Sequence, residues 1–389
     1  MAALAEHLVD TTAGAGSITV AYAPISLQSR IVSGEEWDRT IAGFDQVCQE
    51  QLYTFAVSRW PKVKQEPILF LANGEIVGGA LMMIQPLPLG VGAIAISKWA
   101  PMHKDGSRPD ADGIHAGMVE ALVAEYAQKR GQLLSVLPRA SLTEINYDYE
   151  RLIGRGFKRG SVLAFPNRYL VNLRLSDADQ RKSFHQKWRY HLNKADKAGL
   201  TFEHATPDRL PEFAVLYNAM TDRKQFTDHS AYDTVSELTS IDIEALRPEL
   251  FFVRHEGEIV AGALIFKAGE RAVYLYGATN EKALPLRAGY FIQWNVIRWL
   301  RDNTTANWYD LGGTDGYQGL HQFKKGMVGD AGVIRPVPPV ANYASNPLAY
   351  ALGAGAFLAR DTMNRWRRKI SGALNPKKRS DQASGGNQP

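Results

Sequence analysis

Cysteine is nearly absent from this sequence, which limits the disulfides and the thiol chemistry that the protein can have. The 389 residues include one cysteine, Cys48, so no disulfide can form within the chain and a reducing, cytosolic compartment is expected. No histidine or basic residue stands close to Cys48 in the sequence to lower its pKa. We therefore interpret Cys48 as a small buried hydrophobe rather than a nucleophile.

Long hydrophobic runs are missing as well. The longest candidate, residues 348–359, is too short to span a bilayer. Residues 1–17 carry acidic side chains and no basic segment ahead of an apolar run, so they do not resemble a secretory signal and are expected to form a disordered leader. We expect a cytoplasmic protein that is at most peripheral on the inner face of the plasma membrane.

The sequence also contains no recognisable catalytic or metal-binding motif of a common type. The nine histidines are scattered, no Ser/His/Asp or Cys/His arrangement stands out, and no cluster has metal-ligand spacing. His185 and His191 are six residues apart, which would place them on different sides of a helix. The sequence predicts no metal and no cofactor.

A glycine-rich stretch from Leu311 to Asp330, LGGTDGYQGLHQFKKGMVGD, fails the test for a phosphate-binding loop. Gly313, Gly316 and Gly319 recur every third residue, and no Ser or Thr follows Lys324 or Lys325. The dinucleotide-binding pattern does not fit the stretch either. We expect the two lysines to end a glycine-rich loop that has a purpose other than nucleotide binding.

Charge is concentrated at the C-terminal end. Residues 360–389 contain eight basic side chains against two acidic ones, and removing these from the chain totals of 45 and 40 leaves 37 basic and 38 acidic residues elsewhere. The eight are Arg360, Arg365, Arg367, Arg368, Lys369, Lys377, Lys378 and Arg379. The basic character is therefore a property of the tail.

An internal duplication is the most informative pattern. GEIVGGAL at Gly74–Leu81 and GEIVAGAL at Gly257–Leu264 share seven of eight residues at an offset of 183. An apolar run precedes each copy, and each Gly-Glu stands where a tight hairpin turn would need it.

The surroundings repeat too. Each hairpin is followed by an expected strand (91–99 and 272–279), a helix (113–129 and 286–302) and a second strand (132–138 and 307–313). Further helices are expected at 35–44, 210–220 and 230–246. Each half therefore predicts a mixed α/β sheet with a helix crossing one face.

That order is similar to the core of GNAT acyltransferases. Two copies in one chain resemble the FemABX family, aminoacyl-tRNA-dependent transferases that build peptidoglycan cross-bridges on two tandem GNAT-like domains. The resemblance extends over residues 18–343 and is carried by KWRYHLNKADKAGL, the two GEIV hairpins, and YDLGG followed by GLHQFKKG. It implies an α/β (α+β) fold with a GNAT-like domain at 18–170, a second one at 171–343 that contains the site, a basic amphipathic helix at 344–379 and a disordered tail at 380–389.

The same resemblance implies a catalytic pair. Aminolysis of an aminoacyl-tRNA ester places negative charge on a carbonyl oxygen, which a partly desolvated cation would stabilise. In the family the Phe-Lys pair of this motif has that role, which falls on Phe323 and Lys324, with Lys325 as a solvated neighbour. The alternative is that both lysines end a surface loop. Asp310 or Asp315 could collect the proton of the attacking amine.

A basic helix is expected from Ser176 to Gly199, with Ser176 as its N-cap and one apolar face that includes Trp188. Its basic side chains could follow the phosphates of a tRNA acceptor arm, or they could simply form a solvated face. These tRNA-binding candidates are Arg181, Lys182, Lys187, Arg189, Lys194 and Lys197.

Acceptor-binding residues follow from the resemblance by position. The family uses a lysine near the start of its first domain and an arginine after a helix of its second to hold a diphosphate-linked acceptor, and an arginine fork suits phosphate oxygens. The matches are Lys64, or Lys62, and Arg223, with Tyr276 as a nearby wall. Gly313 and Asp315 of the glycine-rich stretch complete the expected site.

Two other readings remain open at this point. An acyl-CoA-dependent N-acyltransferase shares the fold, although neither half supplies its Gly-rich pyrophosphate pattern cleanly. A non-catalytic adaptor could use the basic tail to bind membrane or RNA, since leucines before the WRRK segment predict an amphipathic helix with a cationic end. The sequence does not identify the amino acid that is transferred, the acceptor or the oligomeric state.

Overall fold

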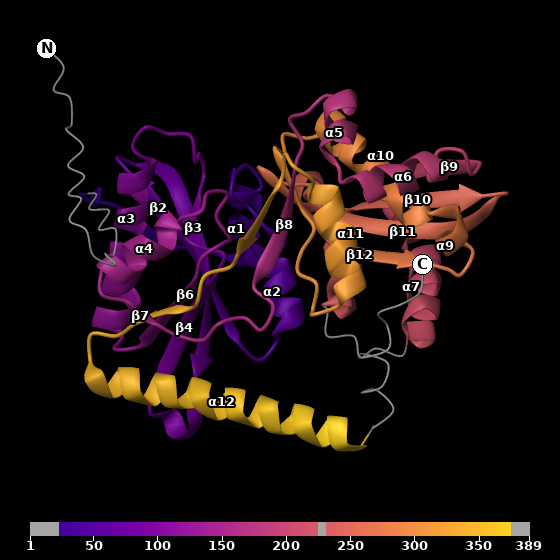
Figure 1. The fold of residues 1–389 in the computed structure, drawn as a ribbon. Helices are drawn as coiled ribbons and strands as arrows, with labels where there is room; N and C mark the ends of the chain where they lie inside the picture. Colours follow the sequence, from indigo (N-terminus) through magenta and orange to yellow (C-terminus); the bar gives the residue numbers. More distant parts are fainter. Residues whose placement is uncertain (1–22, 225–230, 375–389) are drawn as a thin grey trace, which may run out of the picture.

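Two mixed β-sheets stand side by side in the computed structural model, which describes residues 23–224 and 231–374 (Figure 1). The first sheet has the strand order β1-β2-β3-β4-β6-β15-β7, with β5 pairing β3, and the second has the order β14-β8-β13-β12-β11-β10-β9. This is the predicted mixed α/β class. The expected leader at 1–17 and tail at 380–389 lie outside the described residues.

The first sheet is built mainly from the N-terminal half of the chain. Its strands are β1 (Gln28–Ile31), β2 (Lys64–Ala72), β3 (Glu75–Pro86), β4 (Ala93–Lys98), β5 (Met102–His103), β6 (Leu133–Leu137), β7 (Lys158–Arg159) and β15 (Ala341–Tyr343). Its helices are α1 (Gly34–Ile41), α2 (Tyr53–Arg59), α3 (Ala111–Leu122), which continues as a π-helix over Val123–Lys129, and α4 (Tyr147–Gly154).

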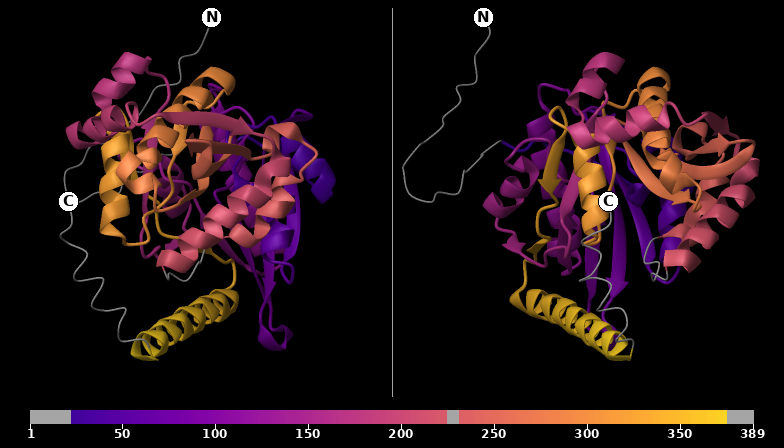
Figure 2. Two further views of the ribbon diagram at one scale, coloured as in Figure 1. Left: turned by 90° about the vertical axis from the view of Figure 1, so that its right-hand side faces the viewer. Right: turned by 45° about the vertical axis from the view of Figure 1, so that its right-hand side comes forward.

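The second sheet comes mainly from the C-terminal half. Its strands are β8 (Asn167–Asn172), β9 (Leu200–Ala205), β10 (Glu249–His255), β11 (Glu258–Phe266), β12 (Arg271–Thr279), β13 (Trp308–Asp310) and β14 (Val333–Pro336). Its helices are α5 (Asp177–Ser183), α6 (Gln186–Ala195), α7 (Leu210–Lys224), α8 (Val235–Thr239), α9 (Ala283–Leu286), α10 (Ala288–Asn303) and α11 (Gln318–Val328). A last helix, α12 (Pro347–Leu374), follows β15 and lies along one end of the molecule (Figure 2).

The duplicated hairpins form as predicted. Their turns are Asn73-Gly74 and Glu256-Gly257, and all four residues have a positive φ, which matches the right-handed twist of the flanking strands. The resemblance extends to an irregularity in register between Phe70 and Leu71 in β2 and between Val253 and Arg254 in β10, again 183 residues apart. The two halves therefore share backbone detail beyond the repeated octapeptide.

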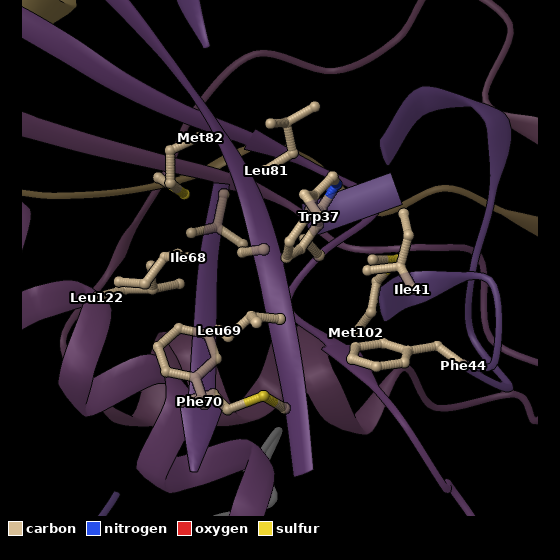
Figure 3. Packing of buried hydrophobic residues seen from close by; sticks show 14 of the residues in the cluster. Trp37, Ile41, Phe44, Ile68, Leu69, Phe70, Leu81, Met82, Met102 and Leu122 are labelled. Atoms are coloured by element: carbon tan, nitrogen blue, oxygen red, sulfur yellow. The ribbon is translucent and has the colours of Figure 1, made fainter. Parts of the chain in front are cut away.

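The core of the first half forms between the hairpin and its helices. Figure 3 shows Ile68 and Phe70 of β2 on the same side of the hairpin as Leu122 of α3, with Trp37 and Ile41 of α1 on the other side, all of them nearly inaccessible to solvent. Burial of a large apolar side chain stabilises a fold by about 1.5–3 kcal/mol. The hairpin that carries the repeat thus forms two adjacent strands of each sheet, and its second strand pairs antiparallel with the strand that follows, β4 or β12.

The last strands of the two halves are exchanged. After β7, the chain leaves the first sheet and forms β8 between β13 and β14 of the second; after β14, it returns and forms β15 between β6 and β7 of the first. The arrangement β6-β15-β7 thus has its counterpart in β13-β8-β14. Each sheet is completed by a strand from the other half.

Two predicted helices were wrong in detail. The expected helix at 176–199 is interrupted at Phe184 and His185, whose backbones are extended, and becomes α5 and α6. The expected helix at 230–246 is reduced, within the described residues, to α8 flanked by single turns at Tyr232–Thr234 and Glu244–Leu246.

Candidate functional site

Lys324 lies on a helix, not at the end of a loop as the sequence predicted. The loop that follows β13 ends at Tyr317, and α11 then carries His321, Phe323 and Lys324. Gly319 and Gly326 are both inside this helix, where glycine costs roughly 0.5–1 kcal/mol relative to alanine. Gly326 is explained by packing, which leaves little room for a side chain at this position.

The indole of Trp188 fills the space beside Gly326. A β-carbon at Gly326 would stand 3.1 Å from Cδ1 of Trp188, so α11 can approach α6 this closely because residue 326 has no side chain. Phe323 packs on the same aromatic group, with ring centroids 6.1 Å from Trp188 and 4.9 Å from Tyr290. Phe323 therefore helps to hold the helix that carries Lys324 against α6 and α10.

The break between α5 and α6 belongs to the same junction. Because His185 is extended, its N–H is turned out of the helix and donates to the carbonyl of Gly326 at 3.0 Å. Arg189 donates from Nη1 to the carbonyls of Lys182 at 2.7 Å and Phe184 at 2.5 Å, which satisfies orphan groups at the end of α5. Tertiary contacts thus override a continuous helical pattern at this point.

The ammonium of Lys324 is enclosed by the loop after β13. Nζ donates to the carbonyl oxygens of Leu311 and Gly313, each at 2.5 Å, and the residue is 6% exposed. An ammonium has three N–H groups, and among the described residues no third acceptor is present for this one. One N–H of a buried cation is therefore left for a ligand.

The position of this cation is set by two parallel strands that separate. β12 and β13 pair only through Arg271–Val273 and Trp308–Asp310, after which β12 continues to Thr279 while the other strand turns into the loop. Gly312 makes that turn with a φ of 75°, which favours glycine. The carboxyl ends of parallel strands are the usual place for ligands in α/β folds.

Asp310 closes the loop through an ion pair with Arg168. The guanidinium donates from Nε to both carboxylate oxygens, at 3.1 and 3.2 Å, and from Nη2 at 3.0 Å, while the N–H of Gly312 donates at 2.9 Å. Burial opposes ionisation, yet Arg168 and Gly312 together hold the pKa of Asp310 below its ordinary value. Asp310 is a poor proton acceptor, which removes one of the two bases that the sequence suggested.

The same surroundings change the acidity of Lys324. Burial, assisted by repulsion from Arg168, lowers its pKa to about 8, while Asp310 and Asp315 act in the opposite direction. The side chain is therefore mainly a cation at neutral pH and loses its proton in a mildly alkaline range. Burying a cation without a direct carboxylate partner is costly, and such strain is typical of functional positions.

His321 was missed by the sequence analysis. Its Nδ1 is 2.5 Å from the hydroxyl of Tyr169 on β8, and it precedes Lys324 by three residues, which places both on one side of α11. The i,i+3 spacing within HQFK was the available signal. Arg168 was missed as well, because its partner Asp310 is 142 residues away in the chain.

The remaining residues of the glycine-rich stretch have distinct places. Gly313 supplies a carbonyl to Lys324, as described above, whereas Asp315 is exposed with a φ of 49°. Lys325 is exposed, as expected. Within the described residues no group of His, Cys, Asp and Glu side chains could hold a metal ion.

The predicted acceptor residues are only partly brought together. Arg223, on α7, donates to the carbonyl of Thr279 at 3.0 Å, three residues beyond Tyr276 on β12. Tyr276 itself is buried against Tyr217 and Tyr232, so it is a wall of the core beneath α7. Lys64 lies on the other sheet, where its exposed side chain pairs with Glu66 at 2.9 Å.

The six candidates for tRNA binding divide into two kinds. Arg189 bonds the backbone at the α5–α6 break, and Arg181 pairs with Asp196 at 2.9 Å and lies over Trp294. The four lysines are exposed and form no ion pair with other described residues. They are Lys182, Lys187, Lys194 and Lys197.

Comparisons with known proteins agree with this architecture. A family model described as an acetyltransferase (GNAT) domain matches residues 182–325. The lipid II:glycine glycyltransferase of Staphylococcus aureus is 34% identical over 91 residues, which are 22% of this chain, and the chain spans 20% of the length of that relative.

Solved structures show the likeness over most of the chain. The crystal structure of FemX is similar with a TM-score of 0.67 at 17% identity, covering 84% of this chain and all of that one. The C-terminal domain of a putative lysylphosphatidylglycerol synthetase from Agrobacterium fabrum is similar with a TM-score of 0.51 at 14% identity, covering 84% and 98% of the two chains. The fold of two GNAT-like halves predicted from the sequence is confirmed.

Proposed function

We propose that the chain is a member of the FemABX family and that it transfers an aminoacyl group from aminoacyl-tRNA to an amine of a peptidoglycan precursor such as lipid II. The observation that carries this proposal is the enclosed ammonium of Lys324, which has one N–H to spare where two parallel strands separate.

The chemistry requires one new bond and one broken bond. The acceptor amine attacks the ester carbonyl, the C–N bond forms, the ester C–O bond breaks, and the tRNA ribose hydroxyl leaves with a proton. Lys324 would donate its remaining N–H to the carbonyl oxygen while that oxygen carries negative charge. Removal of one such donor in other enzymes costs about 2.7–4 kcal/mol of transition-state stabilisation.

A proton must also leave the attacking amine. We assign this role to His321, because the alternative Asp310 is held ionised by Arg168, and because the Tyr169 hydroxyl orients the imidazole. An imidazole is the side chain whose ordinary pKa best suits proton transfer near neutral pH. Asp315 is exposed and bonds no ring that would orient it.

For the tRNA we propose the exposed lysines of α5 and α6, with Arg181 and Arg189 as the residues that hold these helices in place. Lysines on one surface can neutralise backbone phosphates without reading sequence, and each lost phosphate contact reduces the dependence of log affinity on log salt by about one unit. Lys187→Gln with Lys194→Gln should weaken tRNA binding and flatten this dependence. Lys129→Gln, an exposed lysine of the first half, is the matched control. An unchanged salt slope in the double variant would contradict the assignment.

For the acceptor we retain Lys64 and Arg223 as binding residues. Both are cationic, and they lie on the two different halves, so a diphosphate between the halves could contact both. The variants Lys64→Gln and Arg223→Gln should raise the KM for the acceptor and leave its kcat nearly unchanged. A fall in kcat alone would place these residues elsewhere in the cycle.

A peripheral position on an anionic membrane would suit a lipid-linked acceptor. Leu89, between β3 and β4, is 99% exposed and has a φ of 61°, so the backbone is strained at a residue whose side chain meets only solvent. Leu348 and Leu358 of α12 are 64% and 68% exposed. Leu87 beside the turn and Leu352 of α12 belong to one apolar cluster, so turn and helix are neighbours (Figure 2). No helix in the described part of the chain could cross a bilayer.

The decisive experiment compares donors. The full chain is incubated with a pool of labelled aminoacyl-tRNAs and lipid II, and in parallel with acetyl-CoA and the same acceptor. We expect label from at least one aminoacyl-tRNA to appear on the acceptor and CoA to remain acylated. Consumption of acetyl-CoA with no transfer from tRNA would favour the acyl-CoA-dependent alternative, and inactivity with every donor would favour the adaptor.

A further inference from the structure

A cavity opens in the first half of the molecule, at the place that corresponds to the separated strands β12 and β13 of the second half. It has a volume of about 240 Å³ and lies beyond the carboxyl ends of the parallel strands β4 and β6. Trp99 and Arg139 follow these strands, His115 comes from α3, Asp148 from α4, and Arg271 from the second half. The Lys324 cluster lies outside this lining, and Trp99 separates the two because Arg168 stacks on it at 5.7 Å.

One end of the cavity carries excess positive charge. Arg139 donates to the carbonyl of Gln46 at 3.1 Å and Arg271 to that of Ala140 at 2.7 Å, both through Nη1. Arg271 has Glu270 as a neighbour, with Nε 3.3 Å from Oε1, whereas Arg139 forms no ion pair with any described residue. Glu270 is thus the one carboxylate in direct contact with this pair of guanidiniums among the described residues, while Asp310 and Asp148 act on Arg271 from farther away. Burial together with the charge of Arg139 lowers the pKa of Arg271 to about 10, in accord with incomplete neutralisation.

The other end carries excess negative charge. Asp112 and Asp148 share one arginine, Arg151. His115 is 3% exposed, its Nε2 is 3.6 Å from Asp148, and its Nδ1 is buried with no hydrogen-bond partner. Burial lowers the pKa of His115, which keeps the imidazole neutral. Buried polar atoms are nearly always paired, so the unpaired nitrogen indicates that this lining is completed by something else.

We propose that this cavity binds a small zwitterion of the amino-acid or short-peptide class. Its carboxylate would lie between Arg139 and Arg271, and its ammonium would face Asp148. The lining as a whole is balanced in charge but divided into a cationic and an anionic end, which a zwitterion matches at both ends. A doubly charged phosphate would exceed the single excess charge of the arginine end, and an apolar acyl group would leave both ends uncompensated.

The proposal is independent of the transfer chemistry, because none of its residues contacts Lys324 or Asp310 by a hydrogen bond. It gives the first half a binding role of its own. The cavity lies one side chain away from Arg168, so an occupied cavity would restrict the movement of Trp99 against the catalytic half.

The test is a ligand titration of the full chain by calorimetry or protein-observed NMR. The probes are alanyl-alanine, its C-terminal amide, its N-acetyl derivative, and inorganic phosphate. We expect saturable binding of the free dipeptide, at least tenfold weaker binding of the amide and of the N-acetyl derivative, and no competition by phosphate at equal concentration.

Variants locate the binding. Arg139→Gln should weaken dipeptide binding at least tenfold, whereas Arg159→Gln, an exposed arginine on β7 of the same sheet, should not. Lys324→Met should also leave it unchanged, so failure of this proposal and of the proposed function can be told apart. Absence of saturable dipeptide binding, equal binding of acid and amide, or competition by phosphate would each overturn the proposal. The probe series on the unaltered chain decides the question even if Arg139→Gln does not fold.

Discussion

Gly326 lies so close to Trp188 that a β-carbon on the glycine would stand 3.1 Å from the indole ring and 3.3 Å from Cβ of the tryptophan. This contact joins α11 to α6 and thereby joins the helix of Lys324 to the surface proposed for tRNA. The two parts of the site are therefore mechanically connected through one pair of residues.

The first prediction concerns that pair. Gly326→Ala should destabilise the fold by about 1–3 kcal/mol, because a methyl group must force the two helices apart, and it should lower transfer as Lys324 shifts. Gly319→Ala on the same helix is the control, since a β-carbon there meets nothing within 4 Å. It should be neutral or slightly stabilising. Urea unfolding measures the free energy of unfolding of both variants. Equal stabilities would contradict the packing argument.

The second prediction concerns the cation. Lys324→Met should reduce kcat for transfer by about 10²–10³, the range seen when one donor to a developing oxyanion is removed. Acceptor and tRNA binding should persist, since the ammonium is buried away from the proposed binding residues. Lys325→Met, on the exposed side of the helix, should transfer normally. Near-normal turnover by Lys324→Met would end the assignment.

The third prediction is a pH dependence. Because burial lowers the pKa of Lys324 to about 8, transfer should decline as the pH rises through about 8, after correction for spontaneous ester hydrolysis. Lys324→Arg, if active, should lack this decline because a guanidinium stays charged. A flat profile for the unaltered chain between pH 7 and 9.5 would refute the role of the charge.

Stability should move in the opposite direction. The unfolded chain holds a proton on this lysine up to its ordinary pKa of 10.5, so it binds more protons than the folded chain between about 8 and 10.5. This group therefore makes folding more favourable as the pH rises through that window. Thermal melts recorded beside the rates would separate loss of charge from loss of structure.

The fourth prediction concerns Arg168. Arg168→Gln leaves the buried carboxylate of Asp310 with the N–H of Gly312 as its main partner, which should cost about 2–4 kcal/mol of stability. The figure is below the full range for buried pairs because a quarter of the Arg168 side chain is exposed. Adding Asp310→Asn should recover much of the loss, since no charge then remains to be neutralised. A double variant less stable than the single one would contradict this explanation.

The fifth prediction concerns the membrane. Leu89→Asp should reduce co-sedimentation of the full chain with vesicles containing phosphatidylglycerol by several fold, because a charge cannot enter the apolar layer. Val162→Asp is the control, as Val162 is 52% exposed but lies between β7 and β8. Equal pelleting of both variants and the unaltered chain would dismiss the docking turn.

Much of the fold could be predicted from the sequence because the patterns that specify it are local. Each hairpin is specified by a repeated octapeptide and a turn that tolerates positive φ, and these fix two adjacent strands of each sheet. The helix break at Phe184 was not legible, since the apolar spacing continues through it and the reason for the break is a carbonyl at Gly326, far along the chain.

Part of the site could also be predicted, because its motif is a local sequence pattern. The motif identified Lys324 and Phe323, but it did not say that they stand on a helix, because the glycines that suggested a loop serve close packing instead. Arg168 and Asp310 needed the assembled sheet, in which β8 and β13 become neighbours.

The reciprocal placement of β8 and β15 makes the two halves depend on each other for folding. A fragment that contained only one half would lack the strand that pairs with two of its own strands. It would also remove from the other half the strand that completes the second sheet. The half that holds the cation therefore depends on the other half for a complete sheet, and neither half is expected to fold as a separate fragment.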